Sequence, residues 1–209
     1  MMLEIIDVLK DKLYKVFQKE NTGHDISHLV RVFDYALDIQ KYEGGDLYII
    51  AVSALVHDIH RLMSNECGYY VSGEESLDEV RHLLVDSNVD ENKLDEILNV
   101  VKNHDHKDDK NQSLETLIVQ DADALDAIGD IGLERTLKYC KKNNIPITNK
   151  EYPLDTSEYI PDINPISTCH YIHNTMIKDA NNLYTKRARE LAKNKVEILE
   201  RFVKENYEG

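Results

Sequence analysis

The most apolar stretch of the chain ends in two residues that are common metal ligands. The segment LYIIAVSALV covers residues 47–56, and His57 and Asp58 follow it directly. A buried segment that ends in an imidazole and a carboxylate places both groups at the rim of the core, where solvent and substrate reach them. The pair is therefore a candidate for metal binding.

A second polar interruption lies further along the chain, in the run IVQDADALDAIG. Asp121, Asp123 and Asp126 break an otherwise apolar segment there. Three carboxylates so close together repel one another unless a cation or hydrogen-bond donors lie nearby. The run therefore offers a further carboxylate ligand, which we expect to be Asp121.

Together with a histidine on an earlier helical stripe, these residues make a mixed nitrogen and oxygen site. The expected ligands are His28, His57, Asp58 and Asp121. This donor set suits a divalent ion such as Mn²⁺, Fe²⁺, Ni²⁺ or Zn²⁺ better than Ca²⁺. A bound ion lowers the pKa of its water from about 15.7 towards about 7.

Two arginines have the spacing to flank this ion. Arg31 lies three residues after His28, and Arg61 lies four residues after His57, so each shares a helix face with a proposed ligand. Guanidinium groups bind phosphate oxygens through forked hydrogen bonds. Metal, water and arginine together predict hydrolysis of a phosphate ester or anhydride, with Asp58, Arg31 and Arg61 as the catalytic residues.

The elements that must position these residues are all predicted to be helices. Apolar residues recur at helical spacing within residues 5–17, 26–37, 77–84, 94–101 and 192–203. Residues 47–56 are apolar all round, and their length and two alanines favour a central buried helix over a strand. All four prolines lie between residues 146 and 165. We therefore expect one all-α domain over residues 1–209, with a proline-marked connection at about 143–166.

Composition limits the partners. The 209 residues carry 25 Lys and Arg against 39 Asp and Glu, a formal charge of −14. This balance disfavours a nucleic acid polymer or an anionic membrane as the partner, but it permits a pocket for a small phosphate compound. The three cysteines lack Cys-x-x-Cys spacing, and we interpret them as reduced thiols in a cytoplasm. The sequence shows neither a signal peptide pattern nor an apolar run of about 18 residues.

The sequence resembles the HD-domain superfamily of metal-dependent phosphohydrolases. GHDISHLVRV matches the first histidine of the signature, AVSALVHDIHR the His-Asp doublet, and VQDADALDAIGDIGLER the distant aspartate, as Asp121. The stretch NPISTCHYIHN looks like the C-terminal part of small single-domain members. The resemblance covers roughly residues 21–205.

This resemblance implies an all-helical bundle with a metal-site core at about 21–142 and C-terminal helices at about 167–206. It also implies one or two divalent ions. The resemblance adds Mg²⁺ to the candidate metals named above. The expected substrate is a phosphorylated small molecule, often a nucleotide in this family. A homodimer is compatible with the sequence.

The chain departs from the family pattern directly after the doublet. Some nucleotide-cleaving members carry an acidic residue and a lysine there, whereas this chain has Ile59, His60 and Arg61. The general acid and the substrate therefore stay open. Binuclear relatives use further histidines between the doublet and the last aspartate. His82, His104 and His106 lie in that interval, so the number of ions stays open as well.

Several residues have a simpler interpretation beside the functional one. Asp25 is either a helix N-cap or a partner to a metal histidine. Asp123 and Asp126 either bond locally or support the site, and Arg135 is a plausible partner for the acidic run. His170 either approaches the site or is a core histidine with satisfied hydrogen bonds. The segment 104–110 is most simply a solvated loop, with His104 as the member expected to face the site.

Two other functions remain as alternatives. The first is a non-catalytic module that binds a metal and a nucleotide as a sensor, which the departure after the doublet favours. The second is a structural helical protein in which the histidines meet by chance. Metal binding separates the last alternative from the other two.

Overall fold

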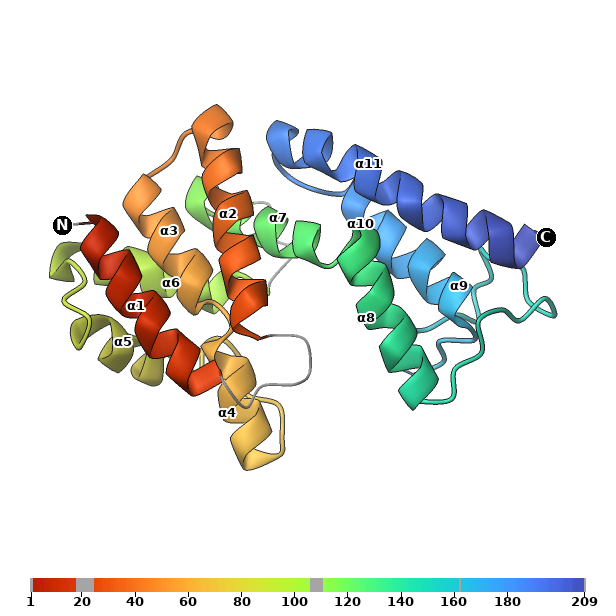
Figure 1. Ribbon diagram of the computed structural model, residues 1–209, viewed down its shortest axis with the longest axis horizontal. Helices are drawn as coiled ribbons and strands as arrows, with labels where there is room; N and C mark the ends of the chain where they lie inside the picture. Colours follow the sequence, from red (N-terminus) through yellow and green to blue (C-terminus); the bar gives the residue numbers. More distant parts are fainter. Residues whose placement is uncertain (1, 18–24, 106–110, 162, 209) are drawn as a thin grey trace. The chain divides into compact units, whose positions relative to one another are not determined.

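The computed structural model describes residues 2–17, 25–105, 111–161 and 163–208, and most of these residues are helical (Figure 1). The helices of the first part are α1 (Met2–Val16), α2 (Ile26–Glu43), α3 (Leu47–Val56), α4 (Ile59–Cys67), α5 (Leu77–Val85), the short 3₁₀ helix η2 (Glu91–Lys93), α6 (Leu94–Asn103) and α7 (Leu114–Asp126). Those of the second part are α8 (Gly129–Lys142), α9 (Thr168–Tyr171), the π-helical η3 (Ile172–Ile177), α10 (Lys178–Asn181), α11 (Lys186–Val203) and the π-helical η4 (Lys204–Glu208).

The prediction of an all-α fold is confirmed. Each segment with helical spacing of its apolar residues is a helix, from α1 at the N-terminus to α11 near the C-terminus. In the residues that the structure describes, the only β-type pairing is one isolated bridge between Ile160 and Asn164. No helix among the described residues has both the length and the hydropathy required to cross a bilayer.

The chain forms two compact units, residues 1–123 and 124–209, and the boundary falls within α7. In the first unit α3 lies at the centre and packs against α1, α2 and α6, while α5 packs against α6. In the second unit α11 packs against α8, η3 and α10. Whenever two of the site residues described below are in contact, both belong to the same unit.

The central helix α3 is enclosed on all sides, as its uniform hydropathy predicts. Asp46 caps its N-terminus by accepting the backbone N–H groups of Tyr48 and Ile49. All residues from Ile49 to His60 are buried, including the polar residues that follow the helix. Burying an aliphatic side chain contributes about 1.5–3 kcal/mol, so this packing holds the end of α3 in place.

The proline-marked stretch lies between α8 and α9 and contains no helix in its described residues. Backbone hydrogen bonds join the two ends of this stretch. The N–H groups of Thr168 and Cys169 donate to the carbonyl oxygens of Pro146 and Ile147. The stretch is thus an ordered connection at both of its ends. The exact domain limits inferred from the sequence stay a prediction.

Candidate metal centre

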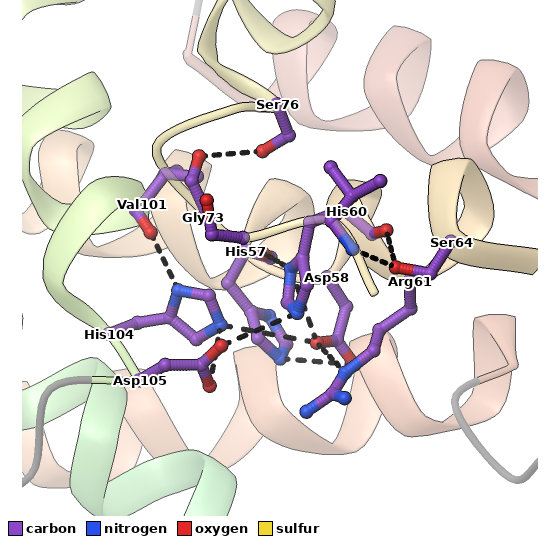
Figure 2. Close-up of polar contacts among 12 residues, drawn as sticks. His57, Asp58, His60, Arg61, Ser64, Gly73, Ser76, Val101, His104 and Asp105 are labelled. Carbon is purple, nitrogen blue, oxygen red and sulfur yellow. Dashed lines mark hydrogen bonds and ion pairs between the residues drawn. The ribbon is translucent and has the colours of Figure 1, made fainter. Parts of the chain in front are cut away.

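His57 and Asp58 occupy the short junction between the buried helix α3 and helix α4. His57 is the C-terminal cap residue of α3, and Asp58 is the residue before α4. Their exposed fractions are 0% and 2%. The doublet is therefore held at the end of the core, and both side chains point into a cluster of polar groups that Figure 2 shows in close-up.

His28 reaches the doublet from α2, which packs against α3. Asp25 caps α2 and accepts the backbone N–H of His28 at 3.0 Å, so the N-cap interpretation of Asp25 is correct. The His28 Nε2 atom lies 3.3 Å from His57 Nε2 and 3.1 Å from Asp58 Oδ2. Three of the four expected ligands thus meet, and all three are buried.

The carboxylate that joins them from α7 is that of Asp123. Its Oδ1 atom lies 3.5 Å from His28 Nε2 and 3.9 Å from His57 Nε2. Asp121 is buried on the same helix two residues earlier. Successive residues of an α-helix are about 100° apart, so these two carboxylates leave α7 on nearly opposite sides. The geometry therefore favours Asp123 in the position for which the sequence analysis named Asp121.

The spacing of these donor atoms fits a shared divalent ion. With metal–ligand distances of about 2.1 Å, two ligands of one ion lie about 3.0 Å apart at right angles and about 4.2 Å apart on opposite sides. The distances among His28 Nε2, His57 Nε2, Asp58 Oδ2 and Asp123 Oδ1 given above run from 3.1 to 3.9 Å, and the one between His57 Nε2 and Asp58 Oδ2 is 3.6 Å. Two imidazoles and two carboxylates suit a divalent transition metal.

Hydrogen bonding and burial keep His57 in the form that binds metal. Its Nδ1 atom lies 2.9 Å from the carbonyl oxygen of Ala54. A carbonyl only accepts, so Nδ1 carries the proton and Nε2 presents its lone pair. Burial lowers the pKa of His57 to about 4, although the charge of Asp58 opposes this shift. The imidazole is therefore neutral at pH 7, as metal binding requires.

A second group of buried ligands adjoins the first and shares Asp58 with it. His60 of α4 and His104, which follows α6, bring nitrogen atoms into range of the Asp58 carboxylate. Asp105 extends this group, since its carboxylate lies beside both imidazoles. Of these three residues, the sequence analysis expected only His104 to face the site. The missed signals are the helical spacing of His60 after His57 and the adjacency of Asp105 to His104.

The two arginines lie near the proposed ligands with part of their surface open to solvent. Arg61 has its Nε atom 3.7 Å from Asp58 Oδ1, and 35% of its side chain is exposed. Arg31 is half-buried on α2, one turn after His28. Positive charge therefore adjoins the first group from α4 and from α2.

Three of the other expected residues have structural roles or lie elsewhere. His82, which the sequence offered as a residue for a second ion, is exposed on α5. His170 is a core histidine, because its Nδ1 and Nε2 atoms lie 2.7 Å from Ser167 Oγ and 3.2 Å from the carbonyl oxygen of Pro153. Asp126 is buried and pairs with Arg135 at 3.3 Å, as the local interpretation predicted. His106 and most of the expected loop at 104–110 lie outside the described residues.

Comparisons with known proteins identify the family to which the ligand-bearing part of the chain is similar. Residues 25–128 match the family model of the HD domain, a range that contains both groups of ligands. The protein YpgQ of Bacillus subtilis is 28% identical over 209 residues, covering 97% of this chain and 92% of the relative.

Solved structures share the fold over nearly the whole chain. That of YpgQ in complex with ADP has a TM-score of 0.76 and 24% identity, covering 98% of this chain and 94% of the other. The Lin1889 protein of Listeria innocua has a TM-score of 0.74 and 27% identity, with the same coverage. An HD-superfamily hydrolase of Bacillus thuringiensis has a TM-score of 0.76 and 24% identity, covering 98% and 96%. With its His-Asp doublet at the end of a buried helix and its match to the family model, this chain belongs to the HD-domain superfamily.

Proposed function

We propose that the protein is a divalent-metal-dependent hydrolase of a phosphate ester or anhydride in a small molecule, with a nucleotide as the substrate. The observation that carries this proposal is the buried cluster of His28, His57, Asp58 and Asp123, whose donor atoms have the spacing of ligands to one ion. In this ligand set Asp123 replaces Asp121.

An ion held by these four residues would supply an activated water at neutral pH and would polarise a phosphate oxygen. The protein's own contribution is to hold the four ligands rigidly and in the correct protonation state. Helix α3 fixes His57 and Asp58, and the Asp25 cap fixes the turn that carries His28. Rigid support of this kind is what a metal site on helices needs in order to keep its geometry.

Arg31 and Arg61 are the proposed phosphate-binding residues. Both lie within one helical turn of a proposed ligand, and both are partly exposed, so that a substrate from solvent reaches them. Their guanidinium groups bind phosphate oxygens and stabilise the negative charge that develops in the transition state. A net charge of −14 makes such a local cationic site necessary for an anionic substrate.

A nucleotide is favoured over other phosphate compounds by one finding from a relative. YpgQ of Bacillus subtilis, whose fold matches along 98% of this chain, has been solved in complex with ADP. A nucleoside diphosphate or triphosphate also provides the anhydride oxygens that a metal and two arginines bind together.

The direct test is release of phosphate or pyrophosphate from a panel of nucleotides with Mn²⁺, Mg²⁺, Zn²⁺, Ni²⁺ or Fe²⁺ added in turn. We expect His57→Ala and Asp58→Ala to lose at least about 100-fold in kcat/KM, because each removes a ligand. His82→Ala is the matched control, since that histidine is exposed on α5. Full activity in both ligand variants would refute the hydrolase assignment, and tight nucleotide binding without turnover would identify a sensor instead.

A further inference from the structure

The loop between α4 and α5 carries two consecutive exposed tyrosines. Tyr69 and Tyr70 are 66% and 62% exposed. A single exposed aromatic side chain is common on protein surfaces. Tyr70 differs in that its ring contacts the candidate metal centre, while the rest of the ring is open to solvent. Its position is therefore compatible with contact to a ligand of that centre.

The contact between Tyr70 and the centre is made through His60. The two ring centroids lie 6.4 Å apart and the ring planes are inclined by 74°, an edge-to-face arrangement that aromatic pairs favour. His60 is itself buried, and its Nδ1 atom lies 4.0 Å from Asp58 Oδ1. One imidazole therefore separates the Tyr70 ring from the carboxylate of the His-Asp doublet.

Two charged groups of the centre also lie near Tyr70. Burial raises the pKa of the Tyr70 hydroxyl above its usual value, the negative charge of Asp105 raises it further, and the positive charge of Arg61 lowers it. Arg61 is the proposed phosphate-binding residue, and its Nε atom lies 3.7 Å from Asp58 Oδ1 (Figure 2). The aromatic ring and the guanidinium group thus adjoin the same part of the cluster.

The backbone on either side of Tyr70 is fixed to α4. Gly68 ends this helix in the left-handed conformation, with a φ of 78°, and its N–H donates to the carbonyl oxygen of Ser64. Val71 is buried, and its N–H donates to Ser64 Oγ at 2.8 Å. A ring that is held in place before a ligand arrives loses little conformational entropy on binding. The loop therefore presents Tyr70 as a preformed surface.

We propose that Tyr70 is the base-binding residue of the site, and that its ring stacks on the nucleobase of a nucleotide whose phosphates contact Arg61. This inference rests on the proposed function, because it takes the substrate to be a nucleotide. In a nucleotide the ribose separates the base from the phosphates, just as His60 separates the Tyr70 ring from Asp58. Stacking uses the π-face that every base has, so we expect both purine and pyrimidine nucleotides to bind.

The experiment compares two ligands that differ by the nucleoside. The full chain, loaded with Mn²⁺, is titrated in a calorimeter with α,β-methylene-ADP, which resists hydrolysis, and with methylenediphosphonate, its counterpart without a base. We expect Tyr70→Ala to weaken binding of α,β-methylene-ADP by about 5- to 150-fold and to change binding of methylenediphosphonate by less than about 2-fold. Tyr70→Phe keeps the ring and should bind both ligands as the wild type does.

Tyr42→Ala is the matched control. Tyr42 is 68% exposed and lies at the opposite end of α2 from His28. Its loss should leave the affinity for both ligands unchanged. Circular dichroism establishes that each variant is folded, and the exposure of both tyrosines makes a folding defect unexpected.

A fluorescence measurement reports stacking directly. The chain contains no tryptophan, so Tyr70→Trp introduces a single indole at the proposed base-binding position. A base that stacks on this indole should quench its fluorescence. We therefore expect saturating α,β-methylene-ADP to quench the emission of Tyr70→Trp and methylenediphosphonate to leave it unchanged. Unchanged emission with saturating α,β-methylene-ADP would overturn the proposal.

Three results of the calorimetry would also overturn the proposal. These are wild-type affinity of Tyr70→Ala for α,β-methylene-ADP, an equal loss for both ligands, and a loss in Tyr70→Phe as large as in Tyr70→Ala, which would assign the effect to the hydroxyl group. Because binding is measured without turnover, the proposed function fails separately. The expected binding pattern in a protein that hydrolyses no nucleotide would contradict the hydrolase assignment and leave base stacking on Tyr70 intact.

Discussion

Asp123 and Asp121 lie only two positions apart on α7, yet we infer that Asp123 is a metal ligand and that Asp121 is not. Both are aspartates in the same short run on α7, and Ala122 lies between them. The carboxylate of Asp123 lies within 4 Å of both His28 and His57. Exchange of either aspartate for asparagine keeps the shape of the side chain and removes its charge.

We expect Asp123→Asn to weaken Mn²⁺ binding at the proposed site by about 10- to 100-fold, because a charged ligand becomes a neutral one. Asp121→Asn is the matched control, and it should change metal affinity much less. Isothermal titration of the metal-free protein with Mn²⁺ measures both. A larger loss of Mn²⁺ affinity in Asp121→Asn than in Asp123→Asn would show that Asp121 is the ligand, as inferred from the sequence.

Protonation of His57 predicts how the stability of the metal-free protein depends on pH. Its folded-state pKa of about 4 lies below the usual value of 6.5, because burial disfavours the charged ring. The unfolded chain therefore takes up a proton first as the pH falls, and stability is lost between about pH 6.5 and pH 4. The shift corresponds to a loss on the order of 3 kcal/mol.

Urea unfolding at several pH values, with a chelator present, measures this loss. His57→Gln should flatten the dependence over the same interval, since glutamine does not titrate. His60 contributes in the same direction, because burial also lowers its pKa. An identical pH dependence in the wild type and in His57→Gln would show that His57 is not the group responsible.

At the scale of the helices, the ends carry the chemistry and the caps position it. His57 and Asp58 lie between α3 and α4, His104 follows α6, and His28 lies in the first turn of α2. Backbone groups at helix ends lack intrahelical partners, and here the carbonyl oxygens of Ala54, His57 and Val101 accept from imidazoles. The tautomer of each of these three imidazoles is therefore fixed by a hydrogen bond to a backbone carbonyl oxygen at the end of a helix.

The cap of α2 is expected to affect both stability and metal binding. Asp25→Ala removes the acceptor for the His28 N–H, which should cost about 1 kcal/mol in the free energy of unfolding. It should also weaken Mn²⁺ binding severalfold, because the turn that carries His28 loosens. Thr185→Ala is a matched control, since Thr185 caps α11 in the second unit. Equal effects of the two variants on Mn²⁺ affinity would contradict this link.

Gly73 packs directly against the end of α6. A Cβ atom at this position would lie 2.8 Å from the carbonyl oxygen of Val101, which holds the ring of His104. Gly73→Ala should therefore displace the last turn of α6 and lower the free energy of unfolding by about 1–3 kcal/mol. Ser72→Ala, at the preceding residue, adds no volume and should lower the free energy of unfolding less. Urea unfolding measures both, and wild-type stability of Gly73→Ala would refute the prediction.

For the molecule as a whole, a bound ion is expected to couple folding to metal concentration. Both groups of ligands lie within residues 1–123, one of the two compact units. An ion that binds only the folded state stabilises it by about 2.7 kcal/mol at a concentration 100 times its dissociation constant. The positive charge of the ion offsets the negative charge of the buried carboxylates. The ion should therefore stabilise this cluster of carboxylates and imidazoles more than any other part of the unit.

We expect Mn²⁺ to raise the midpoint of thermal unfolding by about 5–10 °C over the chelator-treated protein. His28→Gln should abolish most of this increase. His170→Gln provides a contrast, because it removes a hydrogen-bonded core histidine of the second unit and should lower the midpoint while leaving the increase intact. Differential scanning calorimetry measures each case, and an unchanged Mn²⁺ effect in His28→Gln would contradict the site.

Much of the fold follows from the sequence alone, because hydrophobic periodicity is a local property. The apolar stripes located the amphipathic helices, and the continuous apolar run at residues 47–56 identified the buried helix α3. The same run explains why the His-Asp doublet lies at the edge of the core. His28, His57 and Asp58 were found in this way, since their types and surroundings were sufficient.

The tertiary structure alone decided which side chains complete the cluster. Asp121, Asp123 and Asp126 share one short helical run, and the face of α7 that meets α2 and α3 depends on packing between segments far apart in sequence. The same holds for His60, His104 and Asp105, which come from two helix ends and meet only when α3, α4 and α6 pack together. The spacing of residues along the chain indicates on which face of its own helix a side chain lies. Which residues of other helices lie opposite that face is decided by long-range packing.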